Sequence, residues 1–170
     1  RSRGLGDVYK RQISGTQSIT RQGAGLLTLT GNNSSFSGGM VLAGGTTTLG
    51  GGQGNGFNAI GTGSIAFQNG AVLNLNGFNA SDNGTSWGTL TGALSVASGQ
   101  SGVINMPQRG TLASSLTGSG TLGVNVQFVR GELTGNWSAF TGQINVGTVA
   151  GQSSGDFRLN TTTGFGTAAV

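Results

Sequence analysis

The sequence predicts an all-β fold: a single-stranded parallel β-helix (β-solenoid) of roughly six or seven coils, incomplete at both ends. Three observations predict it. Apolar residues recur at every second position in short runs, glycine-rich turns separate these runs, and one longer motif occurs twice. Charged residues make up only 7% of the 170 residues, whereas 36 are glycine. Few charges are left to protect the outer faces and edges of a sandwich, so stacked coils are favoured.

The alternating runs predict strands of roughly 4–6 residues that turn one face towards a core. The apolar positions are Leu27/Leu29, Ile65/Phe67, Leu73/Leu75, Leu94/Val96, Leu122/Val124/Val126 and Ile144/Val146. Turns are expected where glycine or asparagine tolerates a positive φ. These dipeptides are Gly44-Gly45, Asn69-Gly70, Asn76-Gly77 and Asn83-Gly84.

The repeated motif reads Gly-x-Gly-x-Leu-x-(Leu/Val), then Asn-x-Ser-x-Phe-(Ser/Thr)-Gly-x-(Met/Ile)-x-(Leu/Val). It begins at Gly23 and again at Gly118, where extra residues around 130–132 interrupt the second copy. The phenylalanines of the two copies, Phe36 and Phe140, are predicted to fill the interior at a corner of the coil. Small polar side chains are expected to stack in rows outside, with aliphatic side chains stacked inside.

These residues resemble a known family. The run Gly-Ala-Gly-Leu-Leu-Thr-Leu-Thr-Gly-Asn-Asn-Ser-Ser-Phe-Ser-Gly-Gly at 23–39, continuing through 45–49, is similar to the autotransporter-associated β-strand repeat. The similarity covers residues 19–77 well and 116–170 loosely, while 78–115 lies outside the frame. It implies a right-handed parallel β-helix of the passenger type, exported to the bacterial cell surface or secreted, with any membrane anchor or barrel outside this segment.

The first 12 residues differ from the rest. They carry +3 of the net charge of +4, and Asp7-Val-Tyr-Lys-Arg-Gln12 resembles a translated sequencing adaptor. We therefore divide the chain into a non-native segment, 1–12, and a solenoid fragment, 13–170. The high isoelectric point then loses its meaning, and no nucleic-acid partner is expected. The alternative is a basic arm that binds DNA or anionic lipid.

Composition excludes several kinds of chemistry. The chain has no cysteine and no histidine, so disulfides, cysteine or histidine metal sites, cysteine nucleophiles and histidine bases are absent. The glycine run 50–55 lacks the aspartate of calcium-binding solenoid repeats and the lysine of a phosphate loop. No catalytic, cofactor-binding or metal-binding residue is assigned, and no cofactor is expected.

The acidic residues outside the first 12 are Asp82, Glu132 and Asp156. Arg130, Glu132, Asp156 and Arg158 could meet on adjacent coils, where two carboxylates would suffice for glycoside hydrolysis. The other interpretation is a surface ion-pair cluster of little energetic value. Trp87 lies in a polar turn, and Trp137 replaces an asparagine of the first copy, so Trp137 is expected to point outward. An exposed tryptophan can stack on sugars, and the other interpretation is partial packing under a loop.

The favoured function is a structural or adhesive stalk without chemistry of its own, located outside the cell or on its surface. Its expected partners are extracellular glycans or proteins, including those of a host surface. The alternative is a carbohydrate-binding or polysaccharide-degrading β-helix module that uses the tryptophans or the 130–158 cluster. Disorder from low complexity is disfavoured by the regular alternation and the low charge.

Overall fold

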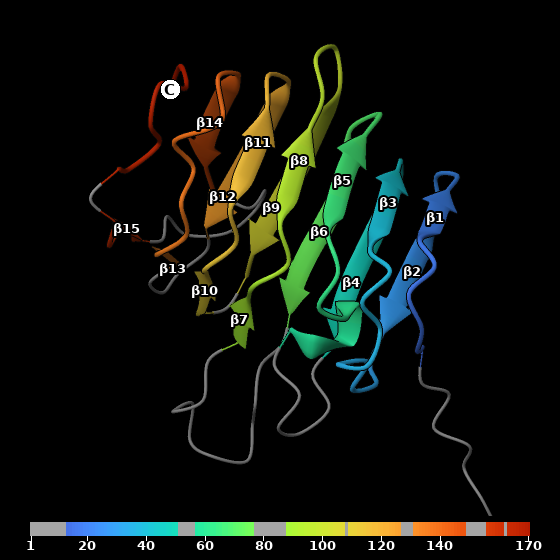
Figure 1. Cartoon of the computed structure of the whole chain (residues 1–170). Helices are drawn as coiled ribbons and strands as arrows, with labels where there is room; N and C mark the ends of the chain where they lie inside the picture. Colours follow the sequence, from blue (N-terminus) through green and yellow to red (C-terminus); the bar gives the residue numbers. More distant parts are fainter. Residues whose placement is uncertain are drawn as a thin grey trace, which may run out of the picture.

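The computed structural model describes residues 13–50, 57–76, 88–107, 109–126, 131–148, 156–161 and 163–170. The predicted all-β parallel solenoid is confirmed, with about five turns rather than six or seven. Its coils follow one another from β1 and β2 at one end to β14 and β15 at the other (Figure 1). The one helical element in the described residues is the short 3-10 helix η1 (Asn58–Ile60).

Three parallel sheets form the walls of the coil. The five-stranded sheet contains, in spatial order, β1 (Ile19–Gln22), β3 (Met40–Ala43), β5 (Ile65–Gln68), β8 (Leu94–Val96) and β11 (Leu116–Gly118). The six-stranded sheet contains β2 (Leu26–Leu29), β4 (Thr46–Gly50), β6 (Ala71–Asn76), β9 (Ser101–Met106), β12 (Thr121–Val126) and β14 (Gln143–Gly147). The four-stranded sheet contains β7 (Gly88–Leu90), β10 (Gly110–Leu112), β13 (Gly131–Leu133) and β15 (Phe157–Leu159).

The coils differ in length although their strands stay in register. Ser101 pairs with Thr121, 20 residues later, whereas Ala71 pairs with Gly102, 31 residues later. The longer coil contains the segment 77–87 between two strands, outside the described residues. Only strand residues need a partner in the next coil, so a corner absorbs extra residues without disturbing the stack.

Two expectations about the frame were wrong. Residues 88–106 of the supposedly out-of-frame stretch form β7, β8 and β9, which stack on neighbouring strands like the rest. The residues thought to interrupt the second copy supply β13, which pairs with β10 and β15. The four-stranded sheet begins only at β7, so the first motif copy has no described counterpart of this wall. Residues 131–133 are therefore part of the third wall of the coil, although they look like an insertion when the two motif copies are aligned.

The core follows from the alternation within each strand. The inward positions of β6, β9 and β12 are buried, and their neighbours in sequence are more accessible. The predicted apolar pairs face this core, with two departures. Leu27, on the terminal strand β2, is half-buried, and Val146, on β14 at the opposite edge of the sheet, is 45% exposed. Both residues lie on edge strands of the six-stranded sheet, where no further strand of that sheet helps to cover an inward side chain.

The turn predictions are confirmed where the structure describes them. Gly44 and Gly45 have φ of 115° and 59°, and Asn69 and Gly70 have φ of 52° and 69°. Asn69 and Gly70 join β5 to β6. Asparagine and glycine adopt a positive φ at a low energetic cost, which suits them to this turn. The other two predicted turns include residues outside the described ranges.

Glycine also makes room for aromatic rings inside the coil. Gly88 and Gly110 occupy inward positions of the four-stranded sheet, and the ring of Phe57 lies against both. A Cβ atom would stand 2.7 Å from the ring at Gly88 and 2.9 Å at Gly110. A large side chain on one wall is therefore matched by a missing side chain on another, which keeps the interior close-packed.

Phe36 and Phe140 fill the interior at equivalent corners, as predicted, with exposed fractions of 2% and 0%. The asparagine that opens the corner motif fixes its turn. Asn136 accepts hydrogen bonds from the Ser138 backbone N–H at 3.0 Å and from the Ser138 hydroxyl at 2.7 Å. Such Asx turns explain why the Asn-x-Ser-x-Phe unit recurs.

Arg21 closes the corner between β1 and β2 from within. It occupies an inward position of β1, it is 8% exposed, and its guanidinium donates hydrogen bonds to the carbonyl oxygens of Gly23, Gly25 and Gly44 and, at 3.3 Å, of Thr46. Five N–H donors in a planar fork suit a convergence of carbonyl groups.

Replacing Arg21 by methionine is expected to lower the free energy of unfolding by about 2–3 kcal/mol, because several hydrogen bonds from a charged donor to partly buried carbonyl groups are lost together. Equilibrium urea unfolding measures the change. The matched control is Arg158→Met, which removes an exposed ion pair with an expected cost below about 1 kcal/mol. Equal losses in the two variants would contradict a specific role for Arg21.

Candidate functional site

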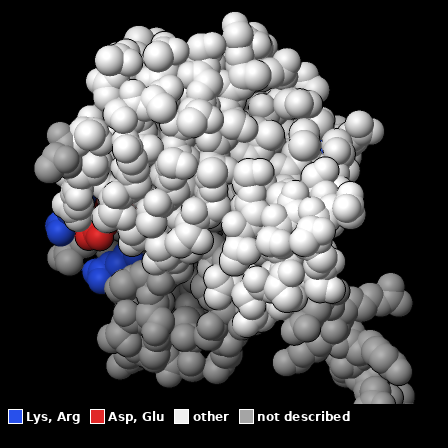
Figure 2. Space-filling view, in the orientation of Figure 1, with Lys and Arg blue, Asp and Glu red and all other residues white. Residues whose placement is uncertain are grey.

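The structure brings part of the predicted charged cluster together. Pairing of β13 with β15 places Glu132 next to Arg158, one coil apart, and Arg158 forms an ion pair with Asp156. Figure 2 shows charged side chains gathered at one edge of the visible face, while most of the described surface there carries no charge. Arg130 and Asp82 lie outside the described residues.

This cluster has the geometry of a surface ion pair. Arg158 donates to both carboxylate oxygens of Asp156, from Nε at 3.2 Å to each and from Nη2 at 3.0 Å to one. Their side chains are 44% and 53% exposed, so water screens the attraction and the pair contributes little to stability. The second carboxylate nearby is that of Glu132, which is half-buried. In the described part of the chain, no group of three acidic side chains is placed to hold a metal ion.

The expectation that Trp137 lies at the surface was wrong. Its exposed fraction is 0%, and its indole Nε1 donates a hydrogen bond to the carbonyl oxygen of Ser114 at 3.0 Å. The ring centroid of Phe165 lies 5.8 Å away at a tilt of 34°. Trp137 therefore offers no ring to a ligand, and Trp87 falls outside the described residues.

The asparagine at the equivalent position of the first motif copy, Asn33, is also buried, so its polarity did not indicate a surface position. Asn33 is 2% exposed, donates from Nδ2 to the carbonyl oxygen of Ala59 at 2.6 Å, and accepts at Oδ1 from the backbone N–H of Ile13 at 2.8 Å. Both copies thus place an inward side-chain N–H against a carbonyl group of a neighbouring coil. A buried polar group is tolerated when it is hydrogen-bonded, so asparagine at a repeat position does not indicate exposure.

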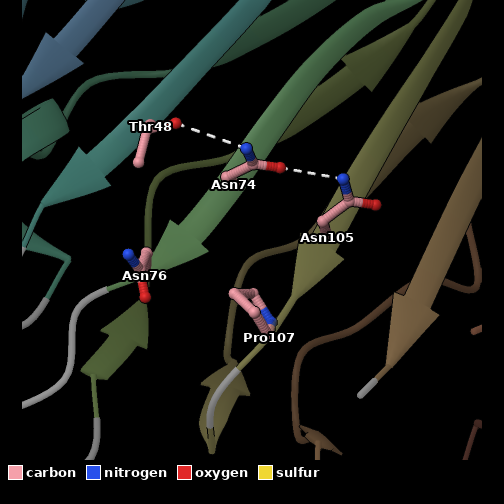
Figure 3. A pocket seen from close by; sticks show the side chains of 5 residues that line it. All are labelled: Thr48, Asn74, Asn76, Asn105 and Pro107. Carbon is pink, nitrogen blue, oxygen red and sulfur yellow. Dashed lines mark hydrogen bonds between the residues drawn. The ribbon is translucent and has the colours of Figure 1, made fainter. Parts of the chain in front are cut away.

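A row of amides on the outer face of the six-stranded sheet is the main feature that sequence reasoning did not locate. The amide ladder consists of Thr48, Asn74, Asn105 and Asn125, at paired positions of four successive strands. Asn125 donates to Asn105 at 2.9 Å. Asn105 donates to Asn74 at 2.8 Å, and Asn74 to the Thr48 hydroxyl at 3.3 Å (Figure 3).

Polar rows were expected in general, but their members were not identified. The signal was an asparagine between two apolar residues in three strands, Leu73-Asn-Leu75, Ile104-Asn-Met106 and Val124-Asn-Val126. Asn74 and Asn105 are paired although they are 31 residues apart. The six or seven coils expected from the sequence correspond to roughly 20–25 residues per coil, so this pairing was not predicted.

Breaking the ladder at its centre is expected to destabilise the fold. Asn105→Ala removes a donor to Asn74 and an acceptor for Asn125, with an expected loss of about 1–2 kcal/mol in the free energy of unfolding, measured in urea. Asn145→Ala is the matched control, since Asn145 is an exposed outward asparagine of the same sheet outside the ladder. A ladder without energetic value would give the same small change in both variants.

A hollow of about 330 Å³ opens beside this ladder. Its lining consists of Thr48, Asn74, Asn76, Asn105 and Pro107, from β4, β6 and the end of β9 (Figure 3). Asn76 is exposed, and no hydrogen bond connects its side chain with another described residue. None of these described lining residues is charged, and together they expose both polar and apolar atoms.

Comparisons with known protein families, with curated proteins and with solved structures return no match. In the described ranges, no helix has the length and apolar character needed to cross a lipid bilayer. The functional conclusion therefore depends on the geometry of the chain itself.

Proposed function

We propose that this chain is a segment of a structural and adhesive β-solenoid stalk that belongs to a secreted or cell-surface bacterial protein and has no chemistry of its own. One observation carries the proposal: six strands of one sheet stack in parallel register. Each coil satisfies the backbone hydrogen bonds of the next, so the fold extends along one axis and suits a rigid spacer.

The distribution of side chains also supports a scaffold. The described charged residues near β13 and β15 include an exposed ion pair, and the nearby aromatic Trp137 lies in the core. The hollow lies on another wall, and its described lining residues are uncharged. Charged and aromatic groups thus do not converge on one cleft in the described residues, whereas an enzyme that cleaves polysaccharides would need such convergence.

The test of surface location uses intact cells of the source bacterium. An antiserum against residues 13–170 detects the protein before and after protease is added to the cells. A ribosomal protein, which the protease cannot reach in intact cells, serves as the internal control. The proposal expects the antigen in the culture medium, or its loss from cells that keep the ribosomal protein. An antigen that is released only when the cells are lysed would overturn the location.

The second candidate is a polysaccharide-degrading module, favoured by the placement of Glu132 beside Arg158 with Asp156 on the same wall. Incubation of residues 13–170 with polygalacturonate and xylan, followed by measurement of new reducing ends, separates the two candidates. The stalk predicts no cleavage by the wild-type chain. Cleavage that disappears in Glu132→Gln and persists in Asn145→Gln would establish catalysis and reject the proposed lack of chemistry.

A further inference from the structure

The hollow beside the amide ladder is a shallow, partly open depression that brings together hydrogen-bonding side chains from three strands. Its volume of about 330 Å³ lies at the lower end of the range of roughly 300–1,000 Å³ that is typical of small-molecule sites. Four of its five lining residues are threonine or asparagine, and the fifth is Pro107. The described lining exposes more apolar than polar surface, so the hollow offers a few hydrogen-bonding groups set among apolar atoms.

The amides are held in fixed orientations before any ligand arrives. Asn74 uses one N–H towards Thr48 and its oxygen towards Asn105, and Asn105 in turn accepts from Asn125. An amide has two N–H donors and two acceptor lone pairs, so each of these asparagines keeps a donor and an acceptor. Because the ladder already restricts the side chains, a ligand pays little conformational entropy to order them.

Asn76 adds an amide that is not committed to the ladder. It lies two residues after Asn74 on β6, so both side chains leave the same face of the sheet. In Figure 3 its side chain lies to the left of Asn74 and Pro107. A ligand in the hollow therefore meets hydrogen-bonding groups on one side and the proline ring on the other.

The character of the lining selects the ligand class. Phosphates and carboxylates are recognised by arginine, lysine or backbone N–H clusters, and no charged side chain lines the hollow among the residues that the structure describes. Hydroxyl groups both donate and accept, which matches the paired donor and acceptor of each amide. A molecule with several adjacent hydroxyls and an apolar C–H face fits both the amides and the proline.

An extended peptide is a poorer fit. Extended peptides bind by adding a strand at an open sheet edge, where backbone N–H and C=O groups have no hydrogen-bond partner. The strands β4, β6 and β9 beneath the hollow are paired on both sides in the six-stranded sheet. The site offers a face of side chains, and recognition there depends on side-chain amides alone.

We propose that this hollow binds a neutral sugar residue of an extracellular glycan, with Asn74, Asn76 and Asn105 as the hydrogen-bonding groups and Pro107 as the apolar contact. The assignment deepens the adhesive part of the proposed function and rests on it. It gives the stalk a weak contact along its side, on a wall separate from the charged cluster.

The experiment is a nuclear magnetic resonance titration of ¹⁵N-labelled residues 13–170. The probes are maltohexaose, cellohexaose, xylohexaose and mannohexaose, with hexagalacturonate as the charged comparison. The proposal expects saturable shifts of the side-chain amide signals of Asn74, Asn76 and Asn105 with at least one neutral probe, and none with hexagalacturonate. Asn76→Ala is expected to weaken binding about tenfold, as the loss of one hydrogen bond implies, without changing the unfolding midpoint.

Asn145→Ala is the matched control and is expected to bind like the wild-type chain. Flat titrations with all four neutral probes, stronger binding of hexagalacturonate, or equal weakening by Asn76→Ala and Asn145→Ala would each overturn the site. The protease experiment on intact cells is independent of this result. Binding by the purified chain combined with an internal location would reject the stalk alone, and a surface location combined with flat titrations would reject the sugar site alone.

Discussion

Replacing Trp137 by alanine is expected to lower the free energy of unfolding by about 4 kcal/mol, within the range of roughly 3–5 kcal/mol found for large aromatic residues in cores. Trp137 is fully buried, and its loss leaves a cavity beside Phe165. It also removes the indole donor from the carbonyl oxygen of Ser114. Equilibrium urea unfolding followed by far-ultraviolet circular dichroism measures the change.

Trp137→Phe separates the two contributions to this loss. The smaller ring retains much of the packing but has no N–H, so an intermediate cost of about 1–2 kcal/mol is expected. Val146→Ala is a second control, because Val146 has an inward register position on a terminal strand yet is 45% exposed. A Trp137→Ala variant that is no less stable than Val146→Ala would show that the corner is not part of a packed core.

A single methyl group at Gly102 is expected to cost about 2–3 kcal/mol, as overpacking of a filled core does. Gly102 lies at an inward position of β9, and an added Cβ atom would stand 2.5 Å from atoms of Phe67 on β5. Neither wall can move without breaking strand pairs with the coils on both sides. The same urea measurement on Gly102→Ala tests the expectation.

Phe67→Leu should partly rescue this variant, because a smaller side chain leaves space for the new methyl group. The double variant is then more stable than the sum of the two single losses predicts, with a coupling of about 1 kcal/mol or more. Gly25→Ala is the control, since its Cβ atom would meet nothing within 4 Å. Additive losses in the double variant would contradict direct contact between Gly102 and Phe67.

Burial and turn conformation were predicted well at positions where they depend on residues nearby in the sequence. Alternation placed Leu73, Leu75 and Val124 in the core, and the structure buries all three completely. The turn at Asn69-Gly70 followed from local backbone preferences. Phe36 was assigned correctly because a large aromatic residue in a repeated corner has little alternative to the interior.

The candidate sites were predicted less completely, because they depend on which coils touch. The 24-residue spacing of Glu132 and Asp156 allowed them to lie on adjacent coils, and the pairing of Glu132 with Arg158 agrees with this placement. The hollow is lined by residues of β4 and β6 together with Asn105 and Pro107. These residues meet because a coil of 31 residues places β9 beside β6. Nothing local in the sequence gives the length of that coil.

The sequence by itself determined the class of fold and the direction in which most side chains point, because a strand alternates its faces whatever stacks on it. Its shortage of reactive residues also limited the chemistry that the chain can perform. Only the tertiary structure decided that the third wall is real, that Trp137 is a core residue, and that asparagines from three coils form one ladder. The physical reason is that burial and hydrogen bonding across coils depend on register, and register is fixed by the stacking of whole coils.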